Sequence, residues 1–134
     1  MVSGAIESVY QVTRIQQICA ELGLWVFNPL WKIDPVQYLR TLVEEGFDVR
    51  IVGVFAYPLT EEWLGRRIDA ETIEELEALS EEHGIQPSGE GGELETSVLS
   101  APGWEKRLEI VESEKAFGKN AGILHIRRVE VRDR

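Results

Sequence analysis

The spacing of apolar residues changes along this chain, from helical in its first two thirds to alternating near its end. Apolar side chains recur every three or four positions over residues 7–22, which predicts a helix that Gly23 ends. A second helix is expected from Asp34-Pro35 to Gly46, because aspartate caps free amides and proline suits the first turn. A third is expected after Asp69, which is also a good cap residue.

Residues 48–57, which read DVRIVGVFAY, form the best strand in the chain. Their continuous apolar run predicts burial on both faces, as in a parallel sheet. Shorter strands are expected at residues 2–5 and 24–27, on either side of the first helix. The alternation of helices and strands in this part of the chain indicates an α/β fold.

The last third alternates between apolar and polar residues, as strands with one buried face do. One strand is expected to start at residues 108–111 and another at residues 123–126, which Val129 and Val131 continue, with a hairpin loop at residues 118–122. The apolar phase slips between Ile126 and Val129, which predicts a bulge or strand end near Arg127.

Charge and composition narrow the classes of function. The net charge is −10, from 14 basic and 24 acidic residues, which argues against general nucleic-acid binding. No apolar run approaches the roughly 20 residues of a membrane span, and no secretory signal begins the chain. Cys19 is the only cysteine, which excludes an internal disulfide and favours the cytoplasm. Its place on the first helix's apolar stripe predicts a packed thiol.

The stretch SGEGGELET at residues 88–96 combines three glycines with three carboxylates. Paired glycines let a backbone turn sharply and expose its amides, whereas neighbouring carboxylates repel one another unless positive charge offsets them. We therefore expect the loop to face a cationic ligand group, an arginine or lysine, or a magnesium ion. A solvated acidic turn is an equal alternative on these grounds. Near the start, the order strand, Gly4, helix is a junction where α/β sheets often bind nucleotides.

Four motifs together resemble one family, the archaeal diphthine–ammonia ligases, which are N-type ATP pyrophosphatases of the PP-loop group. The motifs are GAIESVYQVTR (4–14), NPLW (28–31), EEWLGR (61–66) and EGGELET (90–96). The resemblance implies an enzyme that activates the carboxylate of diphthine, a modified histidine of elongation factor 2, with ATP. Ammonia then displaces AMP to form the diphthamide amide.

The resemblance also implies a division of the chain. Residues 1–32 would be the closing elements of the PP-loop nucleotide-binding domain, a remnant of a Rossmann-like (HUP) parallel sheet. Residues 33–134 would be an α+β substrate-binding domain with C-terminal antiparallel strands. The family's phosphate-binding S-G-G-K-D-S loop is absent from these 134 residues. ATP and Mg²⁺ are thus expected in the complete enzyme but not as tight ligands of this chain alone.

Candidate site residues follow from the matched motifs, and no catalytic residue or metal ligand is assigned. Positions expected near the nucleotide are Gly4, Ala5, Ile6, Ser8, Tyr10, Gln11 and Arg14. Positions expected to bind the substrate are Glu90, Gly91, Gly92, Glu93, Glu95 and Thr96, with Trp63, Gly65 and Arg66 facing the same cleft. A surface ion pair is the alternative for Arg66, and helix-surface packing is the alternative for Tyr10 and Gln11. Leu94 replaces the family's aromatic residue.

The resemblance implies elongation factor 2 and ammonia as partners, together with an N-terminal PP-loop half. The chain could be a natural short protein, a split gene product or a shortened version of a longer one. Removing part of a Rossmann sheet exposes a strand edge, so we expect a homo-oligomer. The alternative function is a free-standing binding module of the same family without catalysis.

Overall fold

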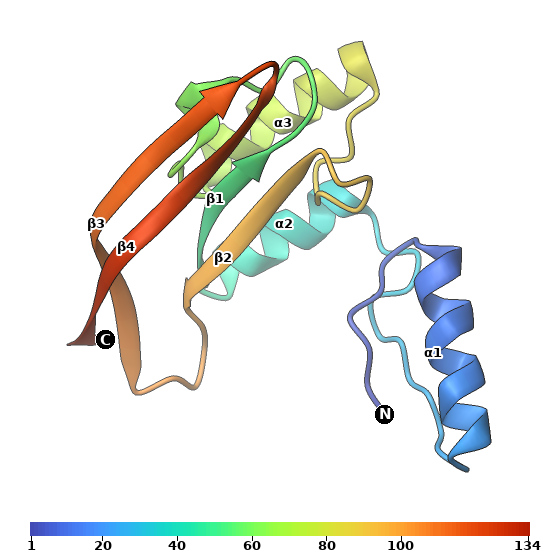
Figure 1. Ribbon diagram of the computed structural model, residues 1–134. Coiled ribbons are helices and arrows are strands. Elements are labelled where there is room, and N and C mark those ends of the chain that lie inside the picture. The colour runs from blue at the N-terminus through green and yellow to red at the C-terminus, as the bar shows by residue number, and fades with distance from the viewer. The chain divides into compact units, whose positions relative to one another are not determined.

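The computed structural model describes all 134 residues, and they form two compact units, Met1–Asp34 and Pro35–Arg134 (Figure 1). In chain order the elements are α1 (Val9–Glu21), α2 (Pro35–Glu44), β1 (Asp48–Val54), the 3₁₀ helix η1 (Glu61–Trp63), α3 (Ala70–His83), β2 (Leu94–Ser100), β3 (Lys106–Gly118) and β4 (Ala121–Asp133). None of the helices has the length and apolar character needed to cross a membrane.

The first unit is a helix between two very short extended segments. The two strands expected here are reduced to one parallel bridge, between Val2 and Phe27. The Ser3 amide donates to the Phe27 carbonyl at 3.0 Å, and the Phe27 amide donates to the Met1 carbonyl at 2.9 Å. A parallel bridge with a helical crossover is compatible with a Rossmann-like sheet, but a single bridge does not establish one, and that assignment stays a prediction.

Helix α1 confirms the first predicted helix, and its ends explain why. Ser8 caps it by accepting a hydrogen bond from the Gln11 amide at 3.3 Å, and Gly23 follows in the left-handed region with φ of 67°. The thiol of Cys19 is buried, as expected for a packed residue. Much of the predicted apolar stripe is nevertheless exposed in this structure, including Val9, Ile18 and Leu22.

The second unit is a four-stranded antiparallel sheet with α2 and α3 on one face (Figure 1). The strand order is β2-β1-β4-β3, so β1 runs antiparallel to both of its neighbours. The expected parallel sheet around residues 48–57 is therefore wrong. The apolar run arises because β1 is an interior strand: Val49 and Ile51 are buried in the core, while Arg50 and Val52 between them are half-buried.

The helices of this unit begin and end where the sequence predicts. Helix α2 starts at Pro35, and Gly46 follows its end with φ of 84°. The Asp69 carboxylate caps α3 by accepting from the Thr72 amide at 2.9 Å, and Gly84 ends it in the left-handed region. The core combines both helices with the sheet, and its least exposed apolar residues are Ile51, Val54, Leu59, Leu64, Ile68, Ile73 and Leu76.

Strands β3 and β4 form the predicted hairpin. Lys119 and Asn120 make a two-residue turn with positive φ at both positions, as in type I′ hairpins. The predicted bulge is confirmed: Glu112 pairs with Arg128 and Ser113 pairs with Ile126, which leaves Arg127 without a partner. Strand β4 pairs with β1 only at its first residues, so most of the hairpin extends past β1.

Candidate functional site

The glycine-rich acidic loop connects the end of α3 to the start of β2. It makes two consecutive tight turns, closed by the Gly89 amide donating to the Gln86 carbonyl and the Gly92 amide donating to the Gly89 carbonyl, both at 2.9 Å. The Phe55 amide then donates to the Glu93 carbonyl at 2.8 Å, which ties the loop to the end of β1. The loop is thus anchored at both ends to elements of the core.

Three glycines of the loop are required by its geometry. Gly89 and Gly92 have φ of 78° and 82°, a region that side chains disfavour. A Cβ at Gly89 would also lie 2.5 Å from the Leu94 carbonyl oxygen. A Cβ at Gly91 would overlap the carboxylate of Glu93, which folds back over the loop. The glycines therefore make room for that carboxylate.

The carboxylates of this loop lack positive partners in the chain. No ion pair joins Glu90, Glu93 or Glu95 to an arginine or lysine. One oxygen of Glu93 accepts a long hydrogen bond, at 3.4 Å, from the Gln86 amide. The other Glu93 oxygen, Oε2 of Glu90 and the Ser88 hydroxyl are buried without a hydrogen-bond partner. Because unpaired buried polar atoms are costly, these three atoms are suited to a ligand that donates hydrogen bonds or carries positive charge.

Helix α2 supplies a neighbour that the sequence did not identify. The phenol of Tyr38 is half-buried, and burial raises its pKa above the usual value. The negative charge of Glu90 raises the same pKa further. A protonated phenol is a hydrogen-bond donor, so Tyr38 adds a neutral donor to the edge of an acidic loop.

The remaining predicted substrate residues in the loop region lie at the surface of β2. Glu95 and Thr96 are exposed, and they pair with Gly53 and Ile51 of β1. Glu93 is half-buried, so Glu93 and Glu95, both predicted to bind the substrate, have different surroundings.

The Trp63–Arg66 segment lies on the other edge of β1. The Ile51 amide donates to the Arg66 carbonyl at 2.9 Å, while Ile51 pairs with Thr96 of β2 on its opposite edge. No hydrogen bond or ion pair joins this segment to the acidic loop. The two predicted substrate segments therefore share no polar contact, and their shared role stays a prediction.

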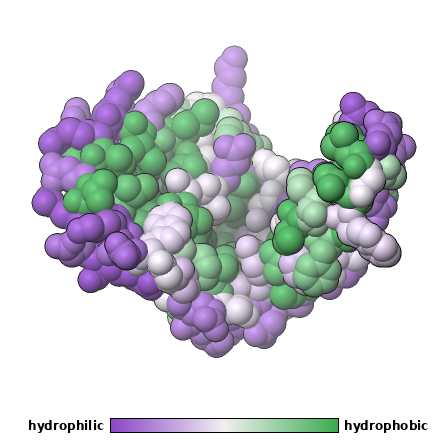
Figure 2. Space-filling view, turned by 90° about the horizontal axis from the view of Figure 1, so that it is seen from below, coloured by the Kyte–Doolittle hydropathy of each residue, from purple (hydrophilic) through white to green (hydrophobic).

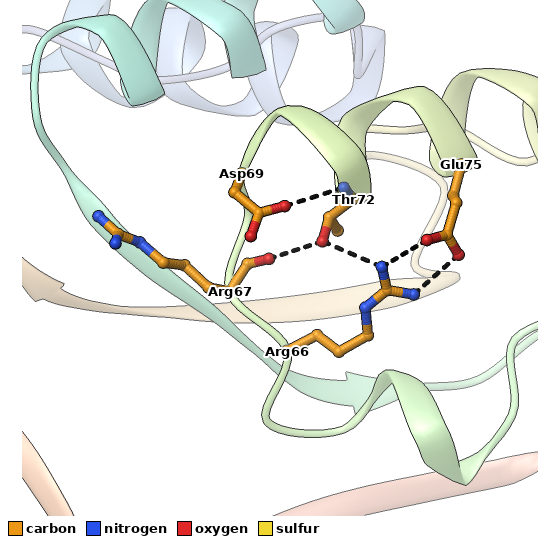
Figure 3. Close-up of polar contacts among 5 residues, drawn as sticks. All are labelled: Arg66, Arg67, Asp69, Thr72 and Glu75. Carbon is orange, nitrogen blue, oxygen red and sulfur yellow. Dashed lines mark hydrogen bonds and ion pairs between the residues drawn. The ribbon is translucent and has the colours of Figure 1, made fainter.

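Arg66 is held by several groups at once (Figure 3). Its guanidinium donates to both carboxylate oxygens of Glu75 on α3, at 2.9 and 2.7 Å, and to the Thr72 hydroxyl at 3.2 Å. It also stacks over the buried ring of Trp63, 4.4 Å from the ring centroid. This is the ion pair that the sequence left open as an alternative for Arg66.

The charges in this cluster stabilise one another. The hydrogen bond and the charge of Arg66 lower the pKa of Glu75. The pKa of Asp69 is lowered first by the hydrogen bond from the Thr72 amide, and the Thr72 hydroxyl donates to the Arg67 carbonyl at 2.8 Å. The bonds that join Arg66 and Arg67 to Thr72 and Glu75 hold the segment before α3 against the helix, so the role of this cluster is structural.

Known proteins resemble this chain over most of its length. The family description "Diphthamide synthase C-terminal domain" matches residues 34–131. The diphthine–ammonia ligase of Schizosaccharomyces pombe is 38% identical over 112 residues, which cover 84% of this chain and 18% of that protein. That of Danio rerio is 32% identical over 138 residues, covering 98% and 53%. The human one is 33% identical over 112 residues, covering 83% and 42%.

The chain belongs to the diphthamide synthase family. The family match begins at Asp34, next to the boundary between the two compact units, and includes the acidic loop and the Arg66 cluster. The Danio rerio match covers nearly all of the chain and so reaches into the first unit. The chain spans about half the length of that relative and less of the other two.

The positions expected near a nucleotide all lie in the first unit. Ala5 and Ile6 are buried, and Gly4 is exposed, in the turn that leads to α1. Ser8 caps the helix, as described above. The longer side chains at the helix surface are exposed: Tyr10, Gln11 and Arg14. Nothing in these contacts tests nucleotide binding, which stays a prediction.

The two histidines, which could take part in catalysis, lie in positions that the fold explains. His83 lies in the last turn of α3 with its ring edge-on to Tyr57, 5.3 Å between centroids. His125 is exposed on β4 between the inward-facing Leu124 and Ile126, as the alternation predicts. No group of three or more histidine, cysteine, aspartate or glutamate side chains could hold a metal ion.

Proposed function

We propose that this chain is the substrate-binding, C-terminal part of an ATP-dependent diphthine–ammonia ligase of the archaeal kind, acting in the cytoplasm. The reaction activates the carboxylate of diphthine on elongation factor 2 with ATP, and ammonia then displaces AMP to give the amide. One observation carries the proposal. In a domain that matches the diphthamide synthase family, the acidic loop holds buried carboxylate oxygens of Glu90 and Glu93 that have no hydrogen-bond partner.

The chemistry of the loop supports a cationic ligand. Of the three counter-charges expected for it, an arginine or lysine partner is absent from the chain. No group of three or more acidic, histidine or cysteine side chains forms a fuller metal site here, although Mg²⁺ itself uses only one or two carboxylates and several waters. Of the two counter-charges left, a magnesium ion and a positive group on the ligand, we propose the second, such as the trimethylammonium end of diphthine.

The nucleotide would be held elsewhere. These residues include no glycine-rich loop with a lysine for the ATP phosphates and no cluster for Mg²⁺. We propose that a PP-loop domain supplies both, and that Gly4–Arg14 of the first unit contributes to that domain. The S. pombe, Danio rerio and human relatives are all longer than this chain, which is in keeping with a further domain.

The matched substrate residues of the loop divide into two groups under this proposal. Gly91 and Gly92 shape the turn, and Glu90 and Glu93 present carboxylates to the ligand. Glu95 and Thr96 lie exposed on β2 and would contact the elongation factor around the modified histidine. Arg66, stacked on Trp63, would support the domain through its bonds to α3, and Gly65 through the backbone bond that its amide donates to Ile51 of β1.

Reconstitution tests the proposal. The chain is assayed for AMP formation with ATP, ammonia and diphthine-bearing elongation factor 2, alone and with a PP-loop domain from a diphthine–ammonia ligase. We expect no AMP from the chain alone and substrate-dependent AMP and amide from the mixture. Adenylation by the chain alone would contradict the proposal that a PP-loop domain supplies the ATP site.

A matched pair of variants locates the substrate site in the same assay. Glu93→Gln keeps the size of the side chain but removes its charge, and we expect its KM for the diphthine protein to rise about tenfold or more. Glu81→Gln makes the same change on the exposed surface of α3 and should leave KM unchanged. If the two variants behave alike, Glu93 is not a substrate residue. If substrate binds normally and no turnover occurs with any PP-loop domain, the binding module without catalysis is the correct reading.

A further inference from the structure

In the second unit, the face of the sheet opposite α2 and α3 is open (Figure 1). Val54 and Leu94 point toward the helices, since both belong to the core. Side chains alternate between the two faces of a strand, so the residues next to them point to the open face. Three positions form a row across that face, because Gly53 of β1 pairs with Glu95 of β2 and with Ile123 of β4.

The aromatic ring of Phe55 lies over this row. A Cβ at Gly53 would be 2.7 Å from a ring carbon of Phe55 and 3.3 Å from the Cβ of Glu95. Only glycine therefore leaves room for the ring at this point of the strand. The ring is nevertheless 39% exposed, and Ile123 beside it is 45% exposed. Two apolar side chains are thus held against the sheet while they face solvent.

Small residues leave a notch beside the ring. Its lining consists of Phe55, Ala116, Ala121, Gly122, Ile123 and His125. Ala121, Ile123 and His125 alternate along β4 and so share the open face. Ala116 of β3 joins them, because it pairs with Ile123. The notch has a volume of about 180 Å³, below the roughly 300–1,000 Å³ of ligand pockets, so it suits a single side chain of a protein.

Exposure of apolar residues alone would not make this notch a binding site. Figure 2 shows apolar side chains at the surface on the side where Figure 1 places the β3–β4 hairpin, and Val129 and Val131 farther along β4 are exposed as well. Such exposure is ordinary in soluble proteins. The notch differs because a glycine admits the ring of Phe55 and small residues keep the space beside the ring empty.

The notch borders carboxylates that have no counter-charge. Glu95, in the same row, makes no ion pair within the chain. The Phe55 amide donates to the Glu93 carbonyl at 2.8 Å, which joins the notch to the acidic loop. A side chain in the notch therefore needs an apolar stem and a positive end. Lysine and arginine have both, because their alkyl stems pack on apolar and aromatic surfaces while the charge stays in water.

The geometry of the sheet gives the spacing between the notch and the loop. Glu93 lies two residues before Glu95, about 7 Å along the strand, and Ile123 lies two strand spacings away, about 10 Å across the sheet. The notch is therefore about 12 Å from Glu93, which an extended chain spans with three or four residues.

We infer that the notch binds a lysine or arginine side chain of the substrate protein, within about four residues of the modified histidine. The alkyl stem lies on Phe55 and Ile123, and the charge meets Glu95. The inference rests on the proposed function, because it takes the acidic loop as the place of the modified histidine. The notch recognises the protein around the histidine, whereas Glu93 recognises the modification.

Two forms of the substrate protein separate these roles. Calorimetry measures the affinity of this chain for elongation factor 2 with diphthine and with the unmodified histidine, which should bind more weakly but measurably. Ala116→Leu fills the notch, and we expect about tenfold lower affinity or less for both forms. Ala78→Leu makes the same change on the exposed surface of α3 and should leave both affinities unchanged. Unchanged or higher affinity in Ala116→Leu would overturn the inference.

The charge at the notch is tested in the same way. Glu95→Gln should lower the affinity for both forms about two- to fivefold, less at high salt, as expected for an exposed ion pair. Glu81→Gln is the exposed control, and Glu93→Gln should affect the diphthine form only. If neither form binds the unaltered chain, the proposed function fails. If both forms bind and the notch variants have no effect, this inference alone fails.

The partner side chain is found from the substrate protein. Alanine replaces, one at a time, the lysines and arginines within about four residues of the modified histidine. One replacement should lower the affinity for the unaltered chain but not for Glu95→Gln, because residues in contact are energetically coupled. Absence of coupling at every position would overturn the assignment of a basic side chain to the notch. Thermal unfolding of each variant checks that the fold is intact.

Discussion

Two groups of charged side chains flank α3, and they are organised in opposite ways. Before the helix, Arg66 is bound by Glu75, Thr72 and the ring of Trp63, so its charge is satisfied within the chain. After the helix, buried oxygens of Glu90 and Glu93 have no partner. Both groups were candidate substrate residues on sequence grounds. The difference teaches that internally satisfied charges stabilise the fold, whereas buried charges without a partner are the better candidates for contact with a ligand.

The largest effect is expected from breaking the loop's backbone. Gly89→Ala introduces a Cβ 2.5 Å from the Leu94 carbonyl oxygen at a positive φ, so we expect a loss of about 3 kcal/mol in the free energy of unfolding. Gly84→Ala is the control, because Gly84 has a similar φ but open space around it. That variant should lose about 1 kcal/mol. Urea denaturation measures both, and equal losses would mean that the close approach at Gly89 is unimportant.

The Arg66 cluster should respond in stability and not in binding. Arg66→Ala removes the two bonds to Glu75, the bond to Thr72 and the stacking on Trp63, and we expect it to lower the free energy of unfolding by about 2 kcal/mol. Arg67→Ala is the neighbouring control, with a single exposed ion pair to Asp48, and should lose under about 1 kcal/mol. A tenfold loss of affinity for the diphthine protein by folded Arg66→Ala would instead make Arg66 a substrate residue.

The loop carboxylates should respond in binding and not in stability. Glu90→Gln removes a charge that has no internal partner, so the free energy of unfolding should change by less than about 0.5 kcal/mol or increase. The same variant should lower the pKa of Tyr38, because the charge that raises this pKa is gone. Ultraviolet titration of the phenol measures the shift. An unchanged Tyr38 pKa would contradict the electrostatic effect of Glu90 on this phenol.

The smallest effect is a pH dependence confined to the Arg66 side of α3. The folded pKa values of Asp69 and Glu75 lie below the ordinary values of 3.8 and 4.5. Their contribution to stability is therefore complete above those values and is lost as the pH falls through the lowered folded pKa. Asp69→Asn keeps a cap residue without a titrating group. The stability difference between the two proteins should shrink below about pH 4, and a constant difference would argue against the lowered pKa.

Local features of the fold were predictable, and pairing between distant segments was not. The helix starts at Pro35 and after Asp69 follow from capping chemistry, and the bulge at Arg127 follows from the slipped apolar phase. The direction of the strands that neighbour β1 was predicted wrongly. An apolar run reports that a strand is interior, but it does not report which segment lies beside it or in which direction.

The candidate site shows the same division. The turn-forming glycines and the acidic character of the loop are visible in residues 88–96. The effect of Glu90 on the pKa of Tyr38 is not, because this residue lies about fifty positions earlier, on α2. The ion pair of Arg66 with Glu75 was one of two open alternatives, and only the packing of the preceding segment on α3 selects it.

The affinity of this chain for diphthine-bearing elongation factor 2 tests the central claim most directly. Isothermal titration calorimetry would compare the unaltered chain with two variants. Glu93→Gln removes one carboxylate charge from the acidic loop, and Glu75→Gln removes one from the group that binds Arg66. The account predicts an affinity at least tenfold lower for Glu93→Gln, with unchanged stability, and the unaltered affinity for Glu75→Gln, with reduced stability. Full affinity in Glu93→Gln would contradict it.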